Sequence, residues 1–259
     1  MAAGEGRIDQ ALGEGSPFPS VWPEAPPELT APQLVALSAR ILARAGHALD
    51  VAGHITLMRD DETMWTTPYG KWWHELTASD ILLVDANGTV LEGPWDVTPA
   101  IFIHTEIHRV RPDAKVVIHN HPEWSTLLAT MHRLPQITDQ QACMFEGEMV
   151  LHDDFAGGVD TAESGASLAE RVAEASVVVL AHEGIIVMGS TVQEATYKFE
   201  TFERTCRLNA RAWMTGQEPV EVPQDKRARL KAMLLRYSTT FYWNGVVRQE
   251  LAADPRVLD

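Results

Sequence analysis

Two histidines, His119 and His121, follow a short apolar run in the segment VVIHNHP at residues 116–122. The run is rich in β-branched residues, which favour a buried strand. In a strand, residues two apart point to the same face, so the two imidazoles lie side by side while Asn120 points to the other face. Neutral imidazole binds zinc, iron, nickel or copper. The spacing therefore predicts a pair of metal ligands, although two polar residues at a strand end would give the same pattern.

A catalytic metal site needs a third protein ligand and leaves positions open for substrate. A second apolar run at residues 177–181 ends in His182, Glu183 and a glycine. His182 would complete a three-histidine set suited to zinc, whereas Glu183 would complete a two-histidine, one-carboxylate set suited to non-haem iron. Because neighbouring residues in a strand face opposite ways, we expect only one of the two to bind the metal.

The composition is that of a globular chain, with 259 residues, 45% of them hydrophobic and 22% charged. A formal charge of -15, from 36 acidic and 21 basic residues, argues against nucleic acid or an anionic membrane surface as a partner. Cys143 and Cys206 predict neither a disulfide framework nor a thiolate zinc site, which favours a reducing cytoplasm. We also expect no targeting segment and no membrane span, because no apolar run approaches about 20 residues.

Helices and strands alternate along the chain. Residues 1–29 are rich in Gly, Pro and Glu and predict a flexible arm. Thr30 and Gln33 form a capping box that opens a helix ended by Gly46. Turn-punctuated segments after residue 54 predict strands, with Ala-Asn-Gly at 86–88 as a hairpin turn. Further helices are expected at 101–111, 123–132 and 191–216. Another helix should precede a pair of strands that ends at residue 189, and two more should lie within 224–250. Residues 30–259 should therefore form one three-layer α/β/α domain with a central mixed or antiparallel sheet and C-terminal helices.

Four segments together resemble the class II aldolase/adducin family, and the resemblance covers about residues 30–215. They are GHIT at 53–56, TTPYGKWWHELTASDILLVDANG at 66–88, IHTEIHRVRPDAKVVIHNHP at 103–122 and AHEGIIVMGSTVQEA at 181–195. The resemblance implies a three-layer α/β/α fold and a homotetramer with active sites between subunits. It also implies one divalent metal per subunit, Zn²⁺ or Fe²⁺ with Mn²⁺ or Co²⁺ as alternatives, held by His119, His121 and a third histidine.

This chain departs from the family pattern at three places. Ala100 stands nineteen residues before His119, where the family's phosphosugar aldolases carry a proton-shuttling glutamate. The bacterial adducin-like branch of the family also replaces this glutamate. The family's Asn-His-Gly is here replaced by His182-Glu183-Gly: a gapless alignment makes Glu183 the ligand, a one-residue bulge makes it His182, and we favour His182 slightly. The positions that bind phosphate in those aldolases hold bulkier residues, which indicates an unphosphorylated substrate: His54, Tyr69, Thr98 and Pro99.

Loss of the glutamate penalises aldol cleavage more than decarboxylation, because only aldol cleavage must deprotonate a hydroxyl. We therefore predict a metal-dependent carbon–carbon lyase, a decarboxylase of an unphosphorylated hydroxy-aromatic or oxo/enol carboxylic acid acting through a metal-stabilised enolate. The alternatives are a non-haem Fe(II) oxygenase that cleaves a side chain oxidatively, an aldolase on an unphosphorylated substrate and, last, a non-catalytic adducin-like module. Candidate proton donors are His104, His54, Tyr237 and Tyr242. Candidate substrate contacts are Tyr69 and Trp124.

Overall fold

A single eight-stranded sheet forms the centre of the computed structural model, which describes residues 25–155, 157–172 and 174–259. The strand order is β4-β3-β2-β1-β5-β8-β7-β6. Neighbouring strands pair antiparallel except β6 and β7, which are parallel, so the sheet is mixed. The strands are β1 (His54–Met58), β2 (Thr63–Thr66), β3 (Leu82–Asp85), β4 (Val90–Glu92), β5 (Val116–Asn120), β6 (Met149–His152), β7 (Val177–Leu180) and β8 (Gly184–Gly189).

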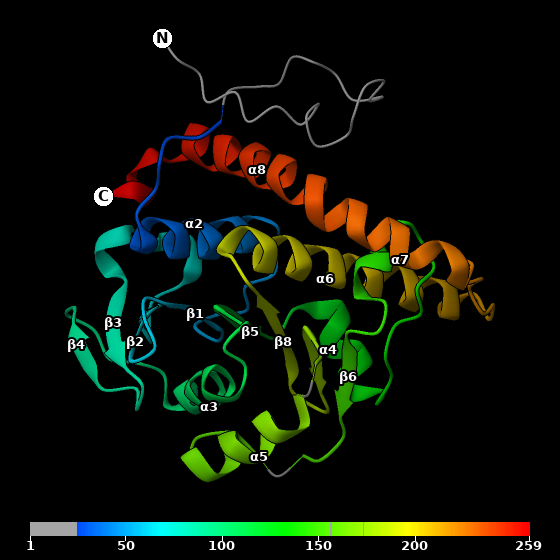
Figure 1. The fold of residues 1–259 in the computed structure, drawn as a ribbon, viewed down its shortest axis with the longest axis horizontal. Coiled ribbons are helices and arrows are strands. Elements are labelled where there is room, and N and C mark those ends of the chain that lie inside the picture. The colour runs from blue at the N-terminus through cyan, green and yellow to red at the C-terminus, as the bar shows by residue number, and fades with distance from the viewer. Residues whose placement is uncertain (1–24, 156, 173) are drawn as a thin grey trace.

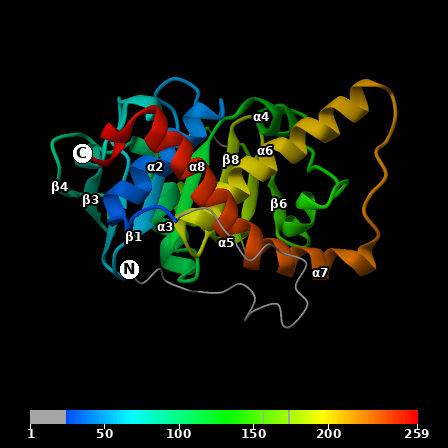
Figure 2. The same ribbon diagram turned by 90° about the horizontal axis from the view of Figure 1, so that it is seen from above.

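Helices cover both faces of this sheet (Figure 1). Helices α2 and α6 lie over one face, with α8 crossing outside them as Figure 2 shows from above, and α3 and α5 lie over the other face. The predicted three-layer α/β/α fold with a mixed sheet is confirmed. The helices are α2 (Ala31–Arg44), α3 (Phe102–Val110), α4 (Glu123–Thr130), α5 (Ala162–Val172), α6 (Val192–Met214), α7 (Gln224–Met233) and α8 (Thr239–Ala253), the last two joined by a π-helical turn.

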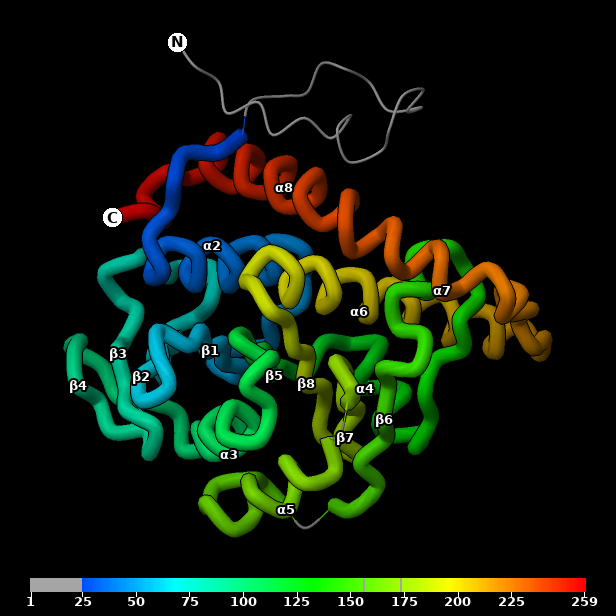
Figure 3. The backbone as a smooth tube through the Cα atoms, viewed as in Figure 1, coloured from blue at the N-terminus to red at the C-terminus, as the bar shows by residue number. Residues whose placement is uncertain are grey.

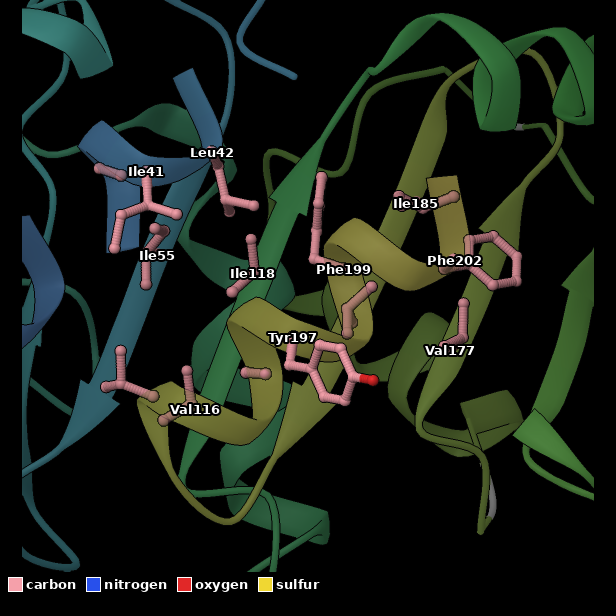
Figure 4. Packing of buried hydrophobic residues seen from close by; sticks show 14 of the residues in the cluster. Ile41, Leu42, Ile55, Val116, Ile118, Val177, Ile185, Tyr197, Phe199 and Phe202 are labelled. Atoms are coloured by element: carbon pink, nitrogen blue, oxygen red, sulfur yellow. The ribbon is translucent and has the colours of Figure 1, made fainter. Parts of the chain in front are cut away.

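Alternation along β5 divides the core into two clusters. Val116 and Ile118 pack with residues of α2 and α6, including Phe199, and Figure 4 shows these side chains together. Val117 points to the other face, where it packs with Ile103 and other residues of α3 and α5. Burial of an aliphatic or aromatic side chain of this size contributes about 1.5–3 kcal/mol, so the apolar residues fix which face each strand residue occupies. His119, two residues after Val117 in the same strand, therefore also faces α3.

Helix α2 begins as the sequence predicts. The backbone N–H of Gln33 donates to the Thr30 hydroxyl at 3.4 Å, and the Gln33 side chain accepts from the Thr30 N–H at 3.0 Å. Gln33 also donates to the carbonyl of Leu258 at 3.1 Å, so the start of α2 lies beside the C-terminus, as the tube in Figure 3 traces. The predicted arm at 1–29 lies outside the described residues except for 25–29, which precede α2 without regular structure.

A buried ion cluster ties α2 to the end of α8. Arg40 donates to Glu250 at 3.0 Å and to Asp254 at 2.7 Å, and Arg44 donates to Glu250 at 2.5 Å. Glu250 is fully buried and Arg40 is only 6% exposed. Burial alone would raise the pKa of Glu250, but hydrogen bonds from Arg44 and Arg40 hold it below its usual value. The carboxylate is therefore ionised because both arginines contact it.

In the part of the chain that the structure describes, no helix combines the length and the apolar character needed to cross a bilayer.

Candidate metal centre

His119 lies in β5 on the face that α3 covers, and His121 follows directly after the end of this strand. His119 pairs across the sheet with His54 of β1 and Ile186 of β8. Its Nδ1 lies 3.0 Å from the carbonyl oxygen of Ile185 and donates to it, which leaves the lone pair on Nε2. Nε2 of His121 lies 2.9 Å from this Nε2. The two imidazoles thus converge through the nitrogens that a metal would use.

Glu183 completes a three-residue cluster with the two histidines. Its Oε1 lies 3.6 Å from Nε2 of His119. The possible ligand atoms of Glu183, His119 and His121 all lie within 4.8 Å of one another. Over residues 25–155, 157–172 and 174–259, this is the one group of three or more His, Cys, Asp or Glu side chains with such spacing.

His182 points away from the cluster. Residues 181–183 form the loop of the hairpin between β7 and β8, whose last pair joins Leu180 and Gly184. His182 has a φ of 62°, in the left-handed region, and its Nε2 lies 2.8 Å from Nε2 of His132. The structure thus places Glu183 beside His119, where we favoured His182. Our preference for His182 required a one-residue bulge relative to the family pattern, whereas in the structure His182 has a positive φ and its side chain contacts His132.

Gly184 lets the hairpin loop approach β5. A Cβ at this position would lie 2.5 Å from the backbone oxygen of Asn120 and 2.5 Å from Cδ2 of His121. Both distances are shorter than any van der Waals contact, and one of the two atoms belongs to the backbone. A larger residue would therefore displace the loop that carries Glu183 from the histidine pair.

The charge states of the cluster suit a divalent cation. Burial, then repulsion by His54 and His121, holds the pKa of His119 well below its usual value, and burial lowers the pKa of His121. Both rings are therefore neutral at pH 7, as metal ligands must be. Burial raises the pKa of Glu183, and a bound cation would offset the cost of its buried charge. The 2.9 Å between the two Nε2 atoms is short enough for both nitrogens to bind one cation.

A pocket of about 250 Å³ opens beside Glu183, between the ends of β6 and β7 and the start of α5. Its polar lining includes His152, Thr161 and Ser164, and Phe155 and Leu180 are among its apolar residues. Among the described residues that line it there is no lysine or arginine. A site for a phosphorylated substrate normally supplies such a cation.

The candidate acid–base residues His54 and His104 lie next to the cluster. The ring centroid of His54 lies 4.9 Å from that of His119, and His54 Nδ1 lies 2.5 Å from His104 Nε2. Two further polar residues, which we did not predict, contact His104 or its neighbours: Thr56 Oγ1 lies 2.7 Å from both His104 Nδ1 and His108 Nε2. The signals were available, because Thr56 shares a strand face with His54 and His108 is one helical turn after His104.

The other candidate residues lie away from the pocket beside Glu183. Tyr69 is a half-exposed loop residue whose N–H donates to the backbone carbonyl of Asp96 at 2.8 Å. Trp124 lies in the first turn of α4, where its N–H donates to the Glu203 carboxylate at 2.7 Å and its ring packs against the core under α2 and α6. Neither is among the residues that line the pocket. Ala100 lies in the 3₁₀ turn before α3 and supplies no carboxylate.

The two C-terminal tyrosines lie with the helices on the opposite side of the sheet from His119. Tyr242 stacks on Tyr197 of α6 with ring centroids 4.7 Å apart, and its hydroxyl donates to Glu200 at 3.5 Å. Burial and the nearby Glu200 raise the pKa of Tyr242. Tyr237 is buried in the π-helical turn between α7 and α8. Within one chain, neither tyrosine reaches the cluster.

The buried histidines make stability depend on pH. Burial lowers the pKa of His108 from 6.5 to about 4, so between these values the unfolded chain binds more protons than the folded one. The stability that this neutral ring provides is complete above about pH 6.5 and is lost as the pH falls towards 4, a change of about 3 kcal/mol. Over this pH range we expect the free energy of unfolding in urea to fall less steeply for His108→Gln than for the wild type. The difference in slope should correspond to close to one fewer proton bound on unfolding.

The exposed His74 offers a matched control for this measurement. Replacing it with glutamine removes a histidine without removing a buried one. An identical pH dependence in wild type and His108→Gln would show that His108 is not kept neutral by the fold.

Known proteins resemble this chain in sequence and in structure. The family model described as the class II aldolase and adducin N-terminal domain matches residues 33–210. A Streptomyces niveus protein named decarboxylase NovR is 32% identical over 229 residues, which are 85% of this chain and 83% of that protein. A Streptomyces roseochromogenus protein named 4-hydroxy-3-prenylphenylpyruvate oxygenase/4-hydroxy-3-prenylbenzoate synthase is 30% identical over 213 residues, 79% of this chain and 76% of that protein.

The fold also matches a solved structure. L-fuculose 1-phosphate aldolase from Glaciozyma antarctica superposes with a TM-score of 0.77 at 23% identity, over 89% of this chain and 96% of that one. At this identity the likeness shows the fold alone. The family model and the relative named as a decarboxylase show an enzyme of the lyase class. Because the family model matches more than half of this chain, the chain belongs to the class II aldolase and adducin N-terminal domain family.

Proposed function

We propose that this protein is a metal-dependent carbon–carbon lyase that decarboxylates an unphosphorylated hydroxy-aromatic or oxo/enol carboxylic acid. The observation that carries the proposal is the convergence of His119, His121 and Glu183 beside a pocket that no lysine or arginine lines among the described residues. A divalent metal at this cluster would supply positive charge to the enolate that remains when carbon dioxide leaves.

The names of two relatives support this substrate class. One is called a decarboxylase, and the other is named for 4-hydroxy-3-prenylphenylpyruvate, which is a hydroxyaryl 2-oxo acid. A pocket of about 250 Å³ with Phe155 and Leu180 in its lining suits an aromatic ring with a short acidic side chain. The absence of the shuttle glutamate at Ala100 also favours decarboxylation over aldol cleavage.

Residues of the chain would bind and orient this acid. The hydrogen bond to the Ile185 carbonyl holds the ring of His119 so that Nε2 faces the cluster. Nδ1 of His152, which lines the pocket, is buried and has no hydrogen-bond partner among the described residues. A hydroxyl or carboxylate of the substrate would satisfy this nitrogen. His54 and His104 stay our candidates for moving a proton, whereas Tyr237 and Tyr242 would have to come from a neighbouring copy.

The carboxylate in the ligand set favours a second candidate function. Two histidines and one carboxylate form the ligand set of many non-haem Fe(II) oxygenases, and one relative is named an oxygenase. In that case decarboxylation would consume oxygen and would require iron, whereas the lyase would work without oxygen.

The two functions differ in one assay. The metal-free protein would be loaded with Zn²⁺ or Fe²⁺ and incubated with a 4-hydroxybenzoate or a 3-oxo acid to test the lyase, and with 4-hydroxyphenylpyruvate to test the oxygenase. Each incubation would be run with and without oxygen while carbon dioxide is measured. We expect carbon dioxide release from the loaded wild type, no release from His121→Gln, and wild-type release from the exposed-histidine variant His74→Gln. Release without oxygen supports the lyase, and strict dependence on Fe²⁺ and oxygen supports the oxygenase. A protein that binds no stoichiometric metal would contradict both.

We also propose a homotetramer with active sites between subunits, located in the cytoplasm. The two cysteines, Cys143 and Cys206, are buried and unpaired, which suits a reducing compartment. Light scattering on the eluting protein would give the subunit number, and a monomer would contradict the shared site.

A further inference from the structure

A continuous file of hydrogen-bonded polar groups lies between β1 and α3 and ends beside the candidate metal ligands. Every side chain in it is less than 9% exposed. Such a buried network has few arrangements of its protons, because each donor must face an acceptor. Its members, from the far end to the ligands, are the carbonyl of Ala114, His108, Thr56, His104 and His54.

The far end of the file fixes its direction. Nδ1 of His108 lies 2.8 Å from the carbonyl oxygen of Ala114, which can only accept, so Nδ1 carries a proton. Burial lowers the pKa of His108 to about 4, so the ring is neutral near pH 7 and its Nε2 carries none. The Thr56 hydroxyl, 2.7 Å from this Nε2, must therefore donate to it.

The direction then passes from Thr56 to His54. A hydroxyl has one proton, so Thr56 Oγ1 accepts from Nδ1–H of His104, 2.7 Å away. Burial holds the pKa of His104 well below its usual value, which leaves Nε2 of this ring as an acceptor. His54 Nδ1, 2.5 Å from that Nε2, must be the donor. In a neutral imidazole one nitrogen donates and the other accepts, so with Nδ1–H directed to His104, Nε2 is the acceptor of this buried ring.

We infer that Thr56, His104 and His108 are positioning residues that hold His54 in the Nδ1–H tautomer, with Nε2 as a hydrogen-bond acceptor beside His119. The ring centroids of His54 and His119 are 4.9 Å apart, so the acceptor belongs to a ring that lies directly beside a candidate metal ligand. The last step rests on the proposed function: Nε2 of His54 would accept a hydrogen bond from an alcoholic or enolic O–H of the bound acid. The site would therefore select acids that carry such a donor, and Nε2 of His54 would not donate a hydrogen bond to them.

Neutron diffraction from crystals of the full-length deuterated protein, grown near pH 7, would locate the ring protons directly. We expect deuterium on Nδ1 and not on Nε2 of His54, His104 and His108. Deuterium on Nε2 of His54 would overturn the inference. The result does not depend on bound metal or on turnover, so a failure of the proposed function would leave it intact and could be told apart from it.

Variants of one residue would test the positioning role. Thr56→Val keeps the shape but removes the hydroxyl, and we expect deuterium to be shared between both nitrogens of His104 and of His54. Thr56→Ser keeps the hydroxyl and should keep the wild-type pattern. Thr66→Val changes the cross-strand neighbour of Thr56, a buried threonine outside the file, and serves as the matched control. An unchanged proton pattern in Thr56→Val would show that Thr56 positions nothing.

Discussion

Replacing Glu183 with glutamine is expected to weaken divalent metal binding at least about 100-fold, and to remove carbon dioxide release at micromolar metal. The reason is the loss of the one anionic donor in a cluster whose two histidines are neutral. Glutamine has nearly the same shape, so the loop between β7 and β8 should stay in place. Titration of the metal-free protein with Zn²⁺ and Fe²⁺ by calorimetry would give the change in affinity.

His182→Asn is the matched control for this variant. Asparagine tolerates the left-handed conformation that His182 adopts, so the loop should keep its course, while the ring contacts with His132 and Phe155 are lost. We expect metal affinity within about threefold of wild type, since side chains outside a ligand set contribute modestly. The reverse result, with tight binding in Glu183→Gln and weak binding in His182→Asn, would identify His182 as the ligand.

Glu250→Ala is expected to lower the free energy of unfolding by about 3–5 kcal/mol. Glu250 is fully buried and accepts hydrogen bonds from Arg40 at 3.0 Å and from Arg44 at 2.5 Å. Without the carboxylate, the guanidinium of Arg40 stays buried with Asp254 as its remaining charged partner. Urea unfolding at pH 7 would measure the loss.

An exposed ion pair gives the comparison for this loss. Arg171 and Asp154 lie 3.2 Å apart with both side chains more than half exposed, so Arg171→Ala should cost less than about 1 kcal/mol. Adding Arg40→Met to Glu250→Ala should recover part of the stability, because it removes a buried guanidinium that has lost one of its two charged partners. A cost below 1 kcal/mol for Glu250→Ala alone would show that the cluster contributes little.

Features set by local sequence were predictable. The capping box at Thr30 and Gln33, the hairpin at 86–88 and the placing of His119 on one face of β5 each depend on residues close together in the chain. Strand periodicity alone places the side chain of His119 opposite that of Ile118, and the packing of the two core clusters agrees with it. Which of His182 and Glu183 lies beside His119 was not predictable in this way, because it depends on the positive φ at His182.

Contacts between distant elements were also beyond sequence reasoning. His104 and His108 stand one helical turn apart, which places them on one face of α3 but does not say what this face meets. Only the fold brings Thr56 of β1 within 2.7 Å of both rings. The same holds for the tyrosines at 237 and 242, whose aromatic character indicated a site but whose helices pack on the opposite side of the sheet.

The hairpin loop at 181–183 separates the choice of metal from the stability of the fold. Its carboxylate, Glu183, is one side chain in a short turn, while the glycine at 184 and the paired strands keep the turn in position. In the proposed metal site, a change from Glu183 to histidine would replace a carboxylate donor with an imidazole without altering any core residue. In evolutionary terms, a lineage with this hairpin could change the donor set of the site by a single substitution and keep its fold.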